Sequence, residues 1–447
     1  QDWGQRWKDD QTFEKSVAQR PADNAYVFYD GPPFITGVPH HGTLLSSIVK
    51  DAVPRYWTMK GKRVERRWGW DCHGLPAENF VEKQMNIMDR RQIVTNSDQP
   101  APLDKDGNPL PTISLEKYIT KARESMVANS ETWQGVIDRI GRWVDFKGAY
   151  RTMDKDFMES VWWAFKQLYE AGKIYEGEKV LMYDTKFATP VSKAEVTMDN
   201  DAYQTVTDPS VYVKFKLVDS DYSILAWTTT PWTLPANLLL AVNPEMTYCE
   251  VLVDGEKLII AEEALERTLQ DEKHQPLEYE IVRKFPGSEL VGKKYQPLDT
   301  GSTWPENDKI HTIYAADFVS HESGTGIVHI APAYGEDDFE LAKRHGISAF
   351  HVIDDNGYYT DGNYTGLEVW DNNKFIAKDL KEKGMVWKIE YIRHEYPFNP
   401  RSKQRIMYRA IPSWFFDIQG QKPLMLEQNE NINCFPSHLK HGRLAMN

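Results

Sequence analysis

The residues best placed to do chemistry lie in two short stretches of this chain, 29–43 and 69–78. The first contains His40 and His41 behind a Gly- and Pro-rich loop, and the second contains Asp71. Free backbone N–H groups at the start of a helix, together with an imidazole donor, can bind a phosphate and stabilise charge during group transfer. The Asp71 carboxylate can hold an ammonium group on a second substrate. These residue types therefore suit a site at which an amino acid meets a nucleotide.

The elements around the two stretches predict how they are positioned. The compact apolar run 25–29 is typical of a buried parallel strand, and apolar residues at helical spacing follow the loop from Leu44 to Ala52. Pro54 is expected to kink or end that helix, and 64–70 is expected to form the next strand. A strand, helix and strand of this length form a right-handed crossover with parallel strands. Both stretches then lie at the carboxyl edge of one sheet, where their polar side chains converge.

A second interpretation of the same residues is purely structural. Gly and Pro make turns wherever they occur, and histidines at the start of a helix can act as capping residues. From spacing alone this interpretation is as good as the catalytic one, because Gly-rich loops are common in proteins of every class.

The exact amino-acid sequences of the two stretches favour the catalytic interpretation over the structural one. Residues 30–42 read DGPPFITGVPHHG, and residues 69–78 read GWDCHGLPAE. The first resembles the HIGH signature region of class I aminoacyl-tRNA synthetases, and the two in this order are similar to the isoleucyl-tRNA synthetases within that class. The resemblance implies an α/β fold with a Rossmann-like parallel sheet, in which His40, Gly42 and Thr43 are catalytic.

The resemblance also implies binding roles. The residues implied to bind ATP are those of the signature, His40, His41, Gly42 and Thr43. Gly31 and Pro32 would line the amino-acid pocket, and Asp71 would bind the substrate α-ammonium group. Thr43 departs from the family, which normally has histidine there; a threonine hydroxyl can still donate to a phosphate but cannot carry a positive charge. His41 stands at the variable position of the signature, where a solvent-facing or packing role is the alternative.

The composition of the chain sets its broad class. At 447 residues it is long enough for about three domains, and its 41% hydrophobic residues can form substantial cores. No run reaches the length of a membrane span and no secretory signal opens the sequence, so no membrane partner is expected. Cys72, Cys249 and Cys434 have no paired spacing, which favours a reducing cytoplasm and argues against a Cys-based zinc site. A net charge of −13 weighs against nonspecific nucleic-acid binding.

The pattern of the chain changes along its length and predicts three regions, 1–200, 201–388 and 389–447. In the first region a Pro- and Asn-rich loop is expected at 95–112. Helices are expected at 3–13, 114–143 and 154–171, and the aromatic stripe of the last, from Val161 to Leu168, is predicted to be core. Short alternating runs predict a β-rich second region. Its expected strands are 211–217, 223–227, 248–253, 257–260 and 327–330, with helices near 261–270 and 337–345.

Polar side chains cluster a second time within the β-rich region. One stretch, 228–237, holds three consecutive threonines and ends in an asparagine, and another, 324–338, holds a histidine and paired carboxylates. These groups could bind an ammonium group and orient a water for ester hydrolysis. The structural alternative is Thr-rich strand pairing with an aspartate capping a helix. Residue types alone favour that alternative.

Both stretches resemble the inserted editing domain of isoleucyl and related synthetases. The residues that the resemblance assigns to its hydrolytic pocket are Thr228, Thr229, Thr230 and Asn237. Asp338 would bind the α-ammonium group, and His329 would help to exclude the larger cognate side chain. Such a site is needed because one missing methylene gives a hydrophobic pocket too little discrimination. The resemblance therefore implies hydrolysis of mischarged Val-tRNA(Ile).

Several expectations about the whole protein follow from the resemblance. Region 1–200 would hold an N-terminal helix and the first half of the Rossmann catalytic domain, 201–388 the inserted β-rich α+β editing domain, and 389–447 the return towards the catalytic domain. Its substrates would be isoleucine, tRNA(Ile), and ATP with Mg²⁺, and a cytoplasmic monomer is expected. Residues 179–190 and Asn399 lack the cysteines of zinc-bearing relatives, so no structural zinc is predicted.

The end of the sequence lacks a KMSKS-like lysine loop and an anticodon-binding domain. An N-terminal portion of a synthetase is therefore expected, with weak or absent aminoacylation and editing as the better preserved activity. The alternatives are a valyl- or leucyl-tRNA synthetase relative, a free-standing trans-editing deacylase, and a noncatalytic paralogue.

Overall fold

The computed structural model describes residues 2–34, 37–96, 98–103, 107–126, 130–193, 195–197, 202–271 and 273–440. The chain forms two compact units, a first unit of Gln1–Ile174 with Asp417–Asn447 and a second unit of Tyr175–Phe416. Parts of five predicted segments lie outside the described residues: 35–36 in the first polar stretch, 97 and 104–106 in the loop at 95–112, 127–129 in a helical region, 198–201 at a domain boundary, and 441–447 in the return segment. Helices and strands are mixed in the described parts, which confirms the predicted α/β class.

The first unit is mostly helical around a short parallel strand pair. Its helices are α1 (Asp2–Asp9), α2 (Thr12–Ala18), α3 (His41–Met59), α4 (Leu75–Gln84), α5 (Leu115–Ser125), α6 (Ser130–Arg139), α7 (Lys155–Glu170) and α11 (Ile418–Glu430). Its strands are β1 (Arg67–Trp70), β2 (Ile93–Val94), β3 (Ile113–Ser114) and β4 (Asp145–Arg151). β1 pairs with β4 in parallel, and Trp68 and Trp70 of β1 pack with Trp133 of α6 in the core.

The predicted strand at 25–29 is wrong. Residues 25–29 form no strand, and Val27 and Tyr29 are 70% and 90% exposed. Isolated parallel bridges join Ala25 to Arg63 and Phe34 to Asp71, so the segment runs beside the next one in the predicted direction but is bonded only at its ends. The physical reason is that no layer covers the run, since Val27 and Tyr29 face solvent, and that Pro32 and Pro33, which have no N–H, cannot extend a ladder through the loop that follows. An apolar run without a covering layer or a complete ladder does not become a buried strand.

Two expectations about helices are also corrected. α3 does not end at Pro54 but continues to Met59. The proline ring is buried there, which offsets the one backbone bond that proline cannot make to the preceding turn. α7 contains no buried residue, and Trp162 in its aromatic stripe is 69% exposed. The stripe was predicted to be core from its spacing, but spacing does not supply a partner surface.

A glycine fixes the close approach of β1 to β4. Gly69 pairs with Tyr150, and a Cβ atom at Gly69 would lie 2.3 Å from the Tyr150 ring. Gly69→Ala is therefore expected to lower the free energy of unfolding by about 1–3 kcal/mol, the usual cost of overpacking. Urea unfolding followed by tryptophan fluorescence measures this change. Gly135→Ala in α6 is the matched control, because nothing lies within 4 Å of that Cβ position and alanine favours a helix. An equal effect of both substitutions would contradict the steric argument.

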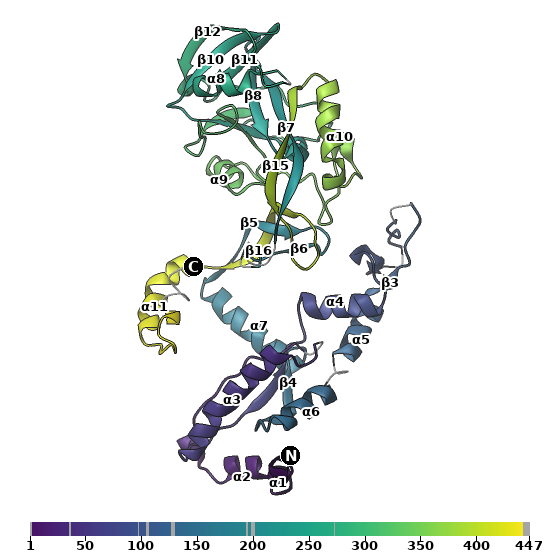
Figure 1. The fold of residues 1–447 in the computed structure, drawn as a ribbon, viewed down its shortest axis with the longest axis vertical. Helices are drawn as coiled ribbons and strands as arrows, with labels where there is room; N and C mark the ends of the chain where they lie inside the picture. The colour runs from purple at the N-terminus through teal and green to yellow at the C-terminus, as the bar shows by residue number, and fades with distance from the viewer. Residues whose placement is uncertain are drawn as a thin grey trace. The chain divides into compact units, whose positions relative to one another are not determined.

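The second unit is built on a large sheet, with the strand order β12-β10-β11-β8-β7-β15. The strands of this unit are β5 (Ile174–Asp184), β6 (Thr189–Pro190), β7 (Tyr203–Lys216), β8 (Ser223–Thr228), β9 (Leu239–Val242), β10 (Thr247–Val253), β11 (Glu256–Ala261), β12 (Tyr279–Pro286), β13 (Thr312–Ala315), β14 (Ile327–Ile330), β15 (Val386–Pro397) and β16 (Ile406–Phe416). Its helices are the 3₁₀ helix η4 (Pro231–Ala236) and the α-helices α8 (Leu265–Thr268), α9 (Glu336–Arg344) and α10 (Val369–Glu382). Figure 1 shows α10 beside the long β7–β15 pair and the shorter strands β8, β10, β11 and β12 gathered at one end of it.

The strands predicted in the second region all occur. The runs 223–227, 248–253, 257–260 and 327–330 fall in β8, β10, β11 and β14, and the run 211–217 falls in β7 except for its last residue. Their apolar residues form the main core of the unit, together with side chains from η4, α8 and α10. The smaller sheet, in the order β13-β9-β14, carries the histidine predicted to be functional.

The compact units divide the chain at different places from the predicted regions. The unit boundaries follow Ile174 and Phe416, whereas the sequence placed them after 200 and 388. β15 pairs with β7 along its length, from Val386–Val213 to Pro397–Tyr203, and β5 and β16 share a sheet. Strand pairing therefore keeps the segments on both sides of the predicted boundaries in one unit.

Candidate functional site

The two polar stretches of the first unit lie side by side. The backbone N–H of Asp71 donates to the carbonyl of Pro33 at 2.9 Å, next to the parallel bridge between Phe34 and Asp71. The loop that carries Gly31 and Pro32 therefore runs past the end of β1, where Asp71 of the second stretch follows Trp70. This is the juxtaposition that the crossover predicts, although it is reached without a continuous strand at 25–29.

The start of α3 is closed by a capping box made of signature residues. The His40 ring accepts a hydrogen bond at Nδ1 from the Gly42 N–H at 3.2 Å. The Thr43 hydroxyl accepts from the His40 N–H at 2.8 Å and donates to the His40 carbonyl at 2.7 Å. His41 is the first residue of the helix and is exposed. The signature residues therefore cap the helix, as the structural interpretation of this stretch expects. A phosphate bound at this helix start would have to share the N–H donors with the cap.

The signature loop is also held by charged residues that the sequence did not single out. Lys50 of α3 donates to the Gly31 carbonyl at 2.9 Å and pairs with Asp30 at 2.5 Å. Asp30 also pairs with the buried guanidinium of Arg142, which lies 5.0 Å from the centre of the Trp68 ring. An acidic residue immediately before Gly31 was the available signal, but its partners are distant in sequence.

Asp71 lies beside a tyrosine that the sequence analysis missed. Burial, followed by the negative charges of Asp30 and Asp71, raises the pKa of the Tyr150 hydroxyl. Asp71 accepts a hydrogen bond from the His73 N–H at 3.4 Å, and the His73 ring contacts the Thr152 hydroxyl at 2.9 Å. The only sequence signal for Tyr150 was Gly69, whose missing side chain leaves room for the ring. Carboxylates beside a phenol form a site that can accept an ammonium group.

In the second unit, the predicted threonines and histidine are joined by one hydrogen-bonded network. The Thr228 and Thr230 hydroxyls are 3.1 Å apart at the end of β8, and Thr229 lies half-buried between them in the chain. The Thr233 hydroxyl donates to the Thr230 carbonyl at 2.9 Å and lies 2.9 Å from Nε2 of His329. Sequence reasoning missed Thr233, although it belongs to the same Thr-rich stretch. η4 brings it to β14.

The ring of His329 is neutral and has a defined tautomer. The Asn237 amide nitrogen lies 2.8 Å from Nδ1 of His329, and an amide nitrogen can only donate, so Nδ1 accepts and the proton is on Nε2. Burial lowers the pKa of His329 to about 3. The histidine is therefore a fixed neutral donor to Thr233 at physiological pH. Asn237 itself is 1% exposed and acts on the site through this contact.

Asp338 lies in the first turn of α9, close to the end of β14. Its carboxylate accepts a hydrogen bond from the Ala331 N–H at 2.7 Å, two residues beyond His329 in the chain. Burial is the main cause that raises the pKa of Asp338 to about 7, and the charge of Asp337 adds to it. This carboxyl group therefore changes charge near neutral pH, which suits a group that binds a cation reversibly.

The family of the chain follows from a comparison with protein-family models. Residues 2–446 match the model described as "tRNA synthetases class I (I, L, M and V)". The chain belongs to this family. The class I synthetase match includes both polar stretches of the first unit and the network of the second.

Curated relatives of this class I synthetase chain are isoleucine–tRNA ligases. It is 43% identical to the isoleucine–tRNA ligase of Corynebacterium diphtheriae over 98% of this chain and 42% of the relative. It is 41% identical to isoleucine–tRNA ligase 2 of Pseudomonas fluorescens over 99% of this chain and 40% of the relative. It is 40% identical to the isoleucine–tRNA ligase of Chlamydia abortus over 98% of this chain and 40% of the relative. The chain thus spans about 40% of the length of these relatives.

The segments from which the absence of zinc is predicted meet inside the second unit. The buried Asp184 carboxylate accepts from the Asn399 amide at 2.5 Å and from the Ser402 hydroxyl. Among the described residues, no group of three or more His, Cys, Asp or Glu side chains is arranged to hold a metal ion. The absence of structural zinc in this class I synthetase chain stays a prediction. Side-chain hydrogen bonds join the two segments here.

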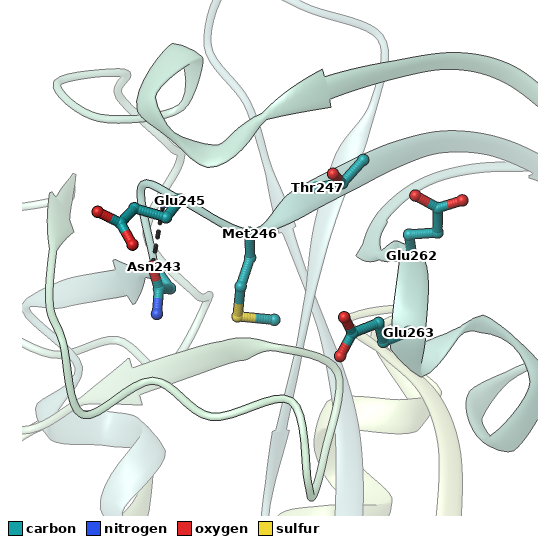
Figure 2. Close-up of a pocket in the computed structure, with 6 residues that line it drawn as sticks. All are labelled: Asn243, Glu245, Met246, Thr247, Glu262 and Glu263. Atoms are coloured by element: carbon teal, nitrogen blue, oxygen red, sulfur yellow. Dashed lines mark hydrogen bonds between the residues drawn. The ribbon is translucent and has the colours of Figure 1, made fainter.

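One pocket of the second unit lies outside the predicted site. It has a volume of about 280 Å³ and is lined by Asn243, Glu245, Met246, Thr247, Glu262 and Glu263. Figure 2 shows three carboxylates around the Met246 thioether. Glu262 pairs with Lys284, and Glu263 lies 3.6 Å from His321, so two of these charges have partners on the protein.

None of the helices within the described ranges is long and apolar enough to span a membrane.

Proposed function

We propose that this chain is part of an isoleucine–tRNA ligase, with an isoleucine and ATP half-site in its first unit and an editing site in its second. The observation that carries the proposal is the network in which a neutral His329 is fixed beside the Thr228–Thr233 hydroxyls. The proposed partners are isoleucine, tRNA(Ile) and MgATP as substrate. A cytoplasmic location and a monomeric state are proposed with them, and gel filtration tests the monomeric state.

The proposed editing reaction is hydrolysis of Val-tRNA(Ile). Asp338 would bind the α-ammonium group when its carboxyl is ionised, and the threonine hydroxyls would orient a water molecule towards the ester carbonyl. The water oxygen forms a bond to the carbonyl carbon, the ester C–O bond breaks, and the ribose oxygen leaves with a proton. His329 would limit the space for the side chain. It is not an imidazolium near neutral pH, since its pKa is about 3, so it does not act as a general acid.

The experiment that tests the editing function is deacylation by the 447-residue chain. Radiolabelled Val-tRNA(Ile) is expected to be hydrolysed, whereas Ile-tRNA(Ile) is expected to remain charged. Hydrolysis of both at equal rates would contradict a discriminating pocket, and hydrolysis of neither would refute the proposed function. Misactivation assays with isoleucine, valine and leucine distinguish the isoleucyl proposal from the valyl and leucyl alternatives.

At the first site, ATP is proposed to place its phosphates at the start of α3, where backbone N–H groups and the helix dipole favour an anion. Lys50 fixes the Gly31 loop, and Asp71 would hold the amino acid's ammonium group on the opposite side. These contacts orient two substrates without forming a bond to either.

In the complete enzyme, Thr43→His is expected to raise the rate of isoleucine activation, because an imidazolium stabilises phosphate charge better than a hydroxyl does. The same change removes both cap bonds of the Thr43 hydroxyl, so the free energy of unfolding should fall by about 1 kcal/mol. ATP–pyrophosphate exchange and urea unfolding measure the two effects. Ser46→Ala, an exposed change one turn further along α3, should alter neither by a comparable amount. An unchanged exchange rate in Thr43→His would sink the hypothesis.

A further inference from the structure

Tyr295 is a buried tyrosine whose hydroxyl points at the editing network from outside it. The residue is 2% exposed, and its ring packs edge-on against Phe215 at 5.3 Å and His311 at 5.6 Å. Its backbone N–H donates to the His311 carbonyl at 3.0 Å. The Tyr295 hydroxyl donates to Oδ1 of Asn237 at 2.7 Å. Packing and backbone bonding thus hold the ring in place, so the direction of this hydroxyl is fixed.

Two contacts set the orientation of the Asn237 amide. The Leu239 carbonyl can only accept, so Nδ2 faces it, and the Tyr295 hydroxyl donates to Oδ1 on the other side. Because Oδ1 receives the tyrosine proton, Nδ2 faces the other way, towards the Leu239 carbonyl at 2.9 Å and Nδ1 of His329 at 2.8 Å. Nδ1 of the histidine must then accept, and Nε2 carries the proton. The Nε2–H group donates a hydrogen bond to the Thr233 hydroxyl oxygen, and the Thr233 hydroxyl donates in turn to the Thr230 carbonyl. The order of donors therefore runs from Tyr295 to Thr230 in one direction.

We propose that Tyr295 is a positioning residue of the editing site, which acts with the Leu239 carbonyl to fix the Nε2–H tautomer of His329 through Asn237. The proposal rests on the proposed editing function and deepens it. Without the Tyr295 hydroxyl, Oδ1 of a buried amide has lost its donor, and such a group costs free energy until it finds another. Turning the amide would break the Leu239 contact but would present Oδ1 to the His329 ring, which would then carry its proton on Nδ1 and donate it to Oδ1. Thr233 would turn its proton to Nε2, and the Thr230 carbonyl would lose its donor.

The first test is spectroscopic and needs no activity. In ¹⁵N-labelled protein the ring nitrogens of His329, assigned by comparison with His329→Gln, are expected to show the Nε2–H tautomer. In Tyr295→Phe the signals should shift towards the Nδ1–H form. Tyr248→Phe is the matched control, because Tyr248 is also fully buried and its hydroxyl donates to the Gly326 carbonyl at 2.7 Å, away from His329. An unchanged tautomer in Tyr295→Phe overturns the proposal.

The second test measures deacylation by the full chain. Tyr295→Phe is expected to lower the ratio of Val-tRNA(Ile) to Ile-tRNA(Ile) hydrolysis by about 10-fold, the factor that one unsatisfied buried polar group of ordinary cost produces. Tyr248→Phe should keep the wild-type ratio. In an Asn237→Ala background, Tyr295→Phe should cause no further loss, because its effect passes through Asn237.

The outcomes separate the two proposals. If the wild-type chain does not hydrolyse Val-tRNA(Ile), the proposed function fails and the role of Tyr295 in it falls as well. If the wild type is active and Tyr295→Phe keeps both ratio and tautomer, only the role of Tyr295 is refuted. A shifted tautomer with an unchanged ratio also refutes it, since the tautomer would then not matter for hydrolysis. Thermal unfolding of each variant identifies a general loss of structure, in which case Tyr248→Phe would fail in the same way.

Discussion

Asp338→Ala is expected to abolish hydrolysis of Val-tRNA(Ile), with a loss of about 100-fold or more in the rate. The physical reason is the loss of the charge partner of a bound ammonium group in a half-buried setting, where truncating one member of a charge pair costs about 2–5 kcal/mol. The Ala331 N–H would also lose the acceptor that it contacts at 2.7 Å. The measurement is release of valine from radiolabelled Val-tRNA(Ile).

The neighbouring Asp337 provides the control. It lies in the same first turn of α9 but is exposed, so Asp337→Ala removes an equal charge without removing the carboxylate that faces Ala331. At pH 8 this variant should hydrolyse Val-tRNA(Ile) at close to the wild-type rate. Equal losses in both variants would show that net charge at the helix start matters, rather than the Asp338 carboxylate.

The pH dependence of the wild type follows from the raised pKa of Asp338, about 7. Only the ionised carboxylate pairs with an ammonium group, so deacylation should rise as the pH increases from 6 to 8. The sign for stability is opposite. The unfolded carboxyl ionises near pH 4, so between about pH 4 and 7 the folded state binds more protons, and this group's contribution to stability falls as the pH rises. Asp338→Asn should therefore gain stability relative to the wild type over that range, as measured by urea unfolding at each pH.

The second unit was the more predictable part of the fold. Its strands can be predicted from local sequence, because alternating or continuous apolar runs such as 248–253 and 327–330 are bounded by turn residues. The same reasoning failed at 25–29, whose apolar letters are as good, because a strand also needs a neighbour that bonds along its whole length. α7 makes the equivalent point for helices. Its stripe has the right spacing, but none of its residues is buried.

The candidate site residues were predictable where several polar side chains lie together in one stretch of sequence. They were not predictable where tertiary packing brings a distant side chain to the site. Thr228, Thr230 and His329 were identified from residue types and resemblance, and the structure joins them through Thr233. Tyr295 lies far from all of them in sequence and has no motif around it. Tyr150 is similar, since only the fold brings it over Gly69 and beside Asp71. Contacts of this kind depend on which strands pair, and a single sequence does not state that.

Asp71→Asn is expected to weaken isoleucine binding to the first site by about 10- to 100-fold, the range for losing a hydrogen bond to a charged group. The substitution keeps the shape of the side chain. The backbone N–H of residue 71 would still donate to Pro33, and the amide oxygen would still accept from the His73 N–H. What is lost is the negative charge, which together with Asp30 also raises the pKa of Tyr150. Isothermal titration of isoleucine into each protein measures the change.

A ligand without an ammonium group separates charge recognition from local damage. 3-Methylpentanoate has the side chain and carboxylate of isoleucine but no amine, so Asp71→Asn should bind it as well as, or better than, the wild type. Asp138→Asn is the control variant, because Asp138 pairs with Lys8 in a mostly exposed contact and should leave both affinities unchanged. If Asp71→Asn lost affinity equally for both ligands, the residue would be shaping the loop. If it lost affinity for isoleucine alone, the carboxylate would be reading the ammonium group, and the two polar stretches would be two sides of one amino-acid site.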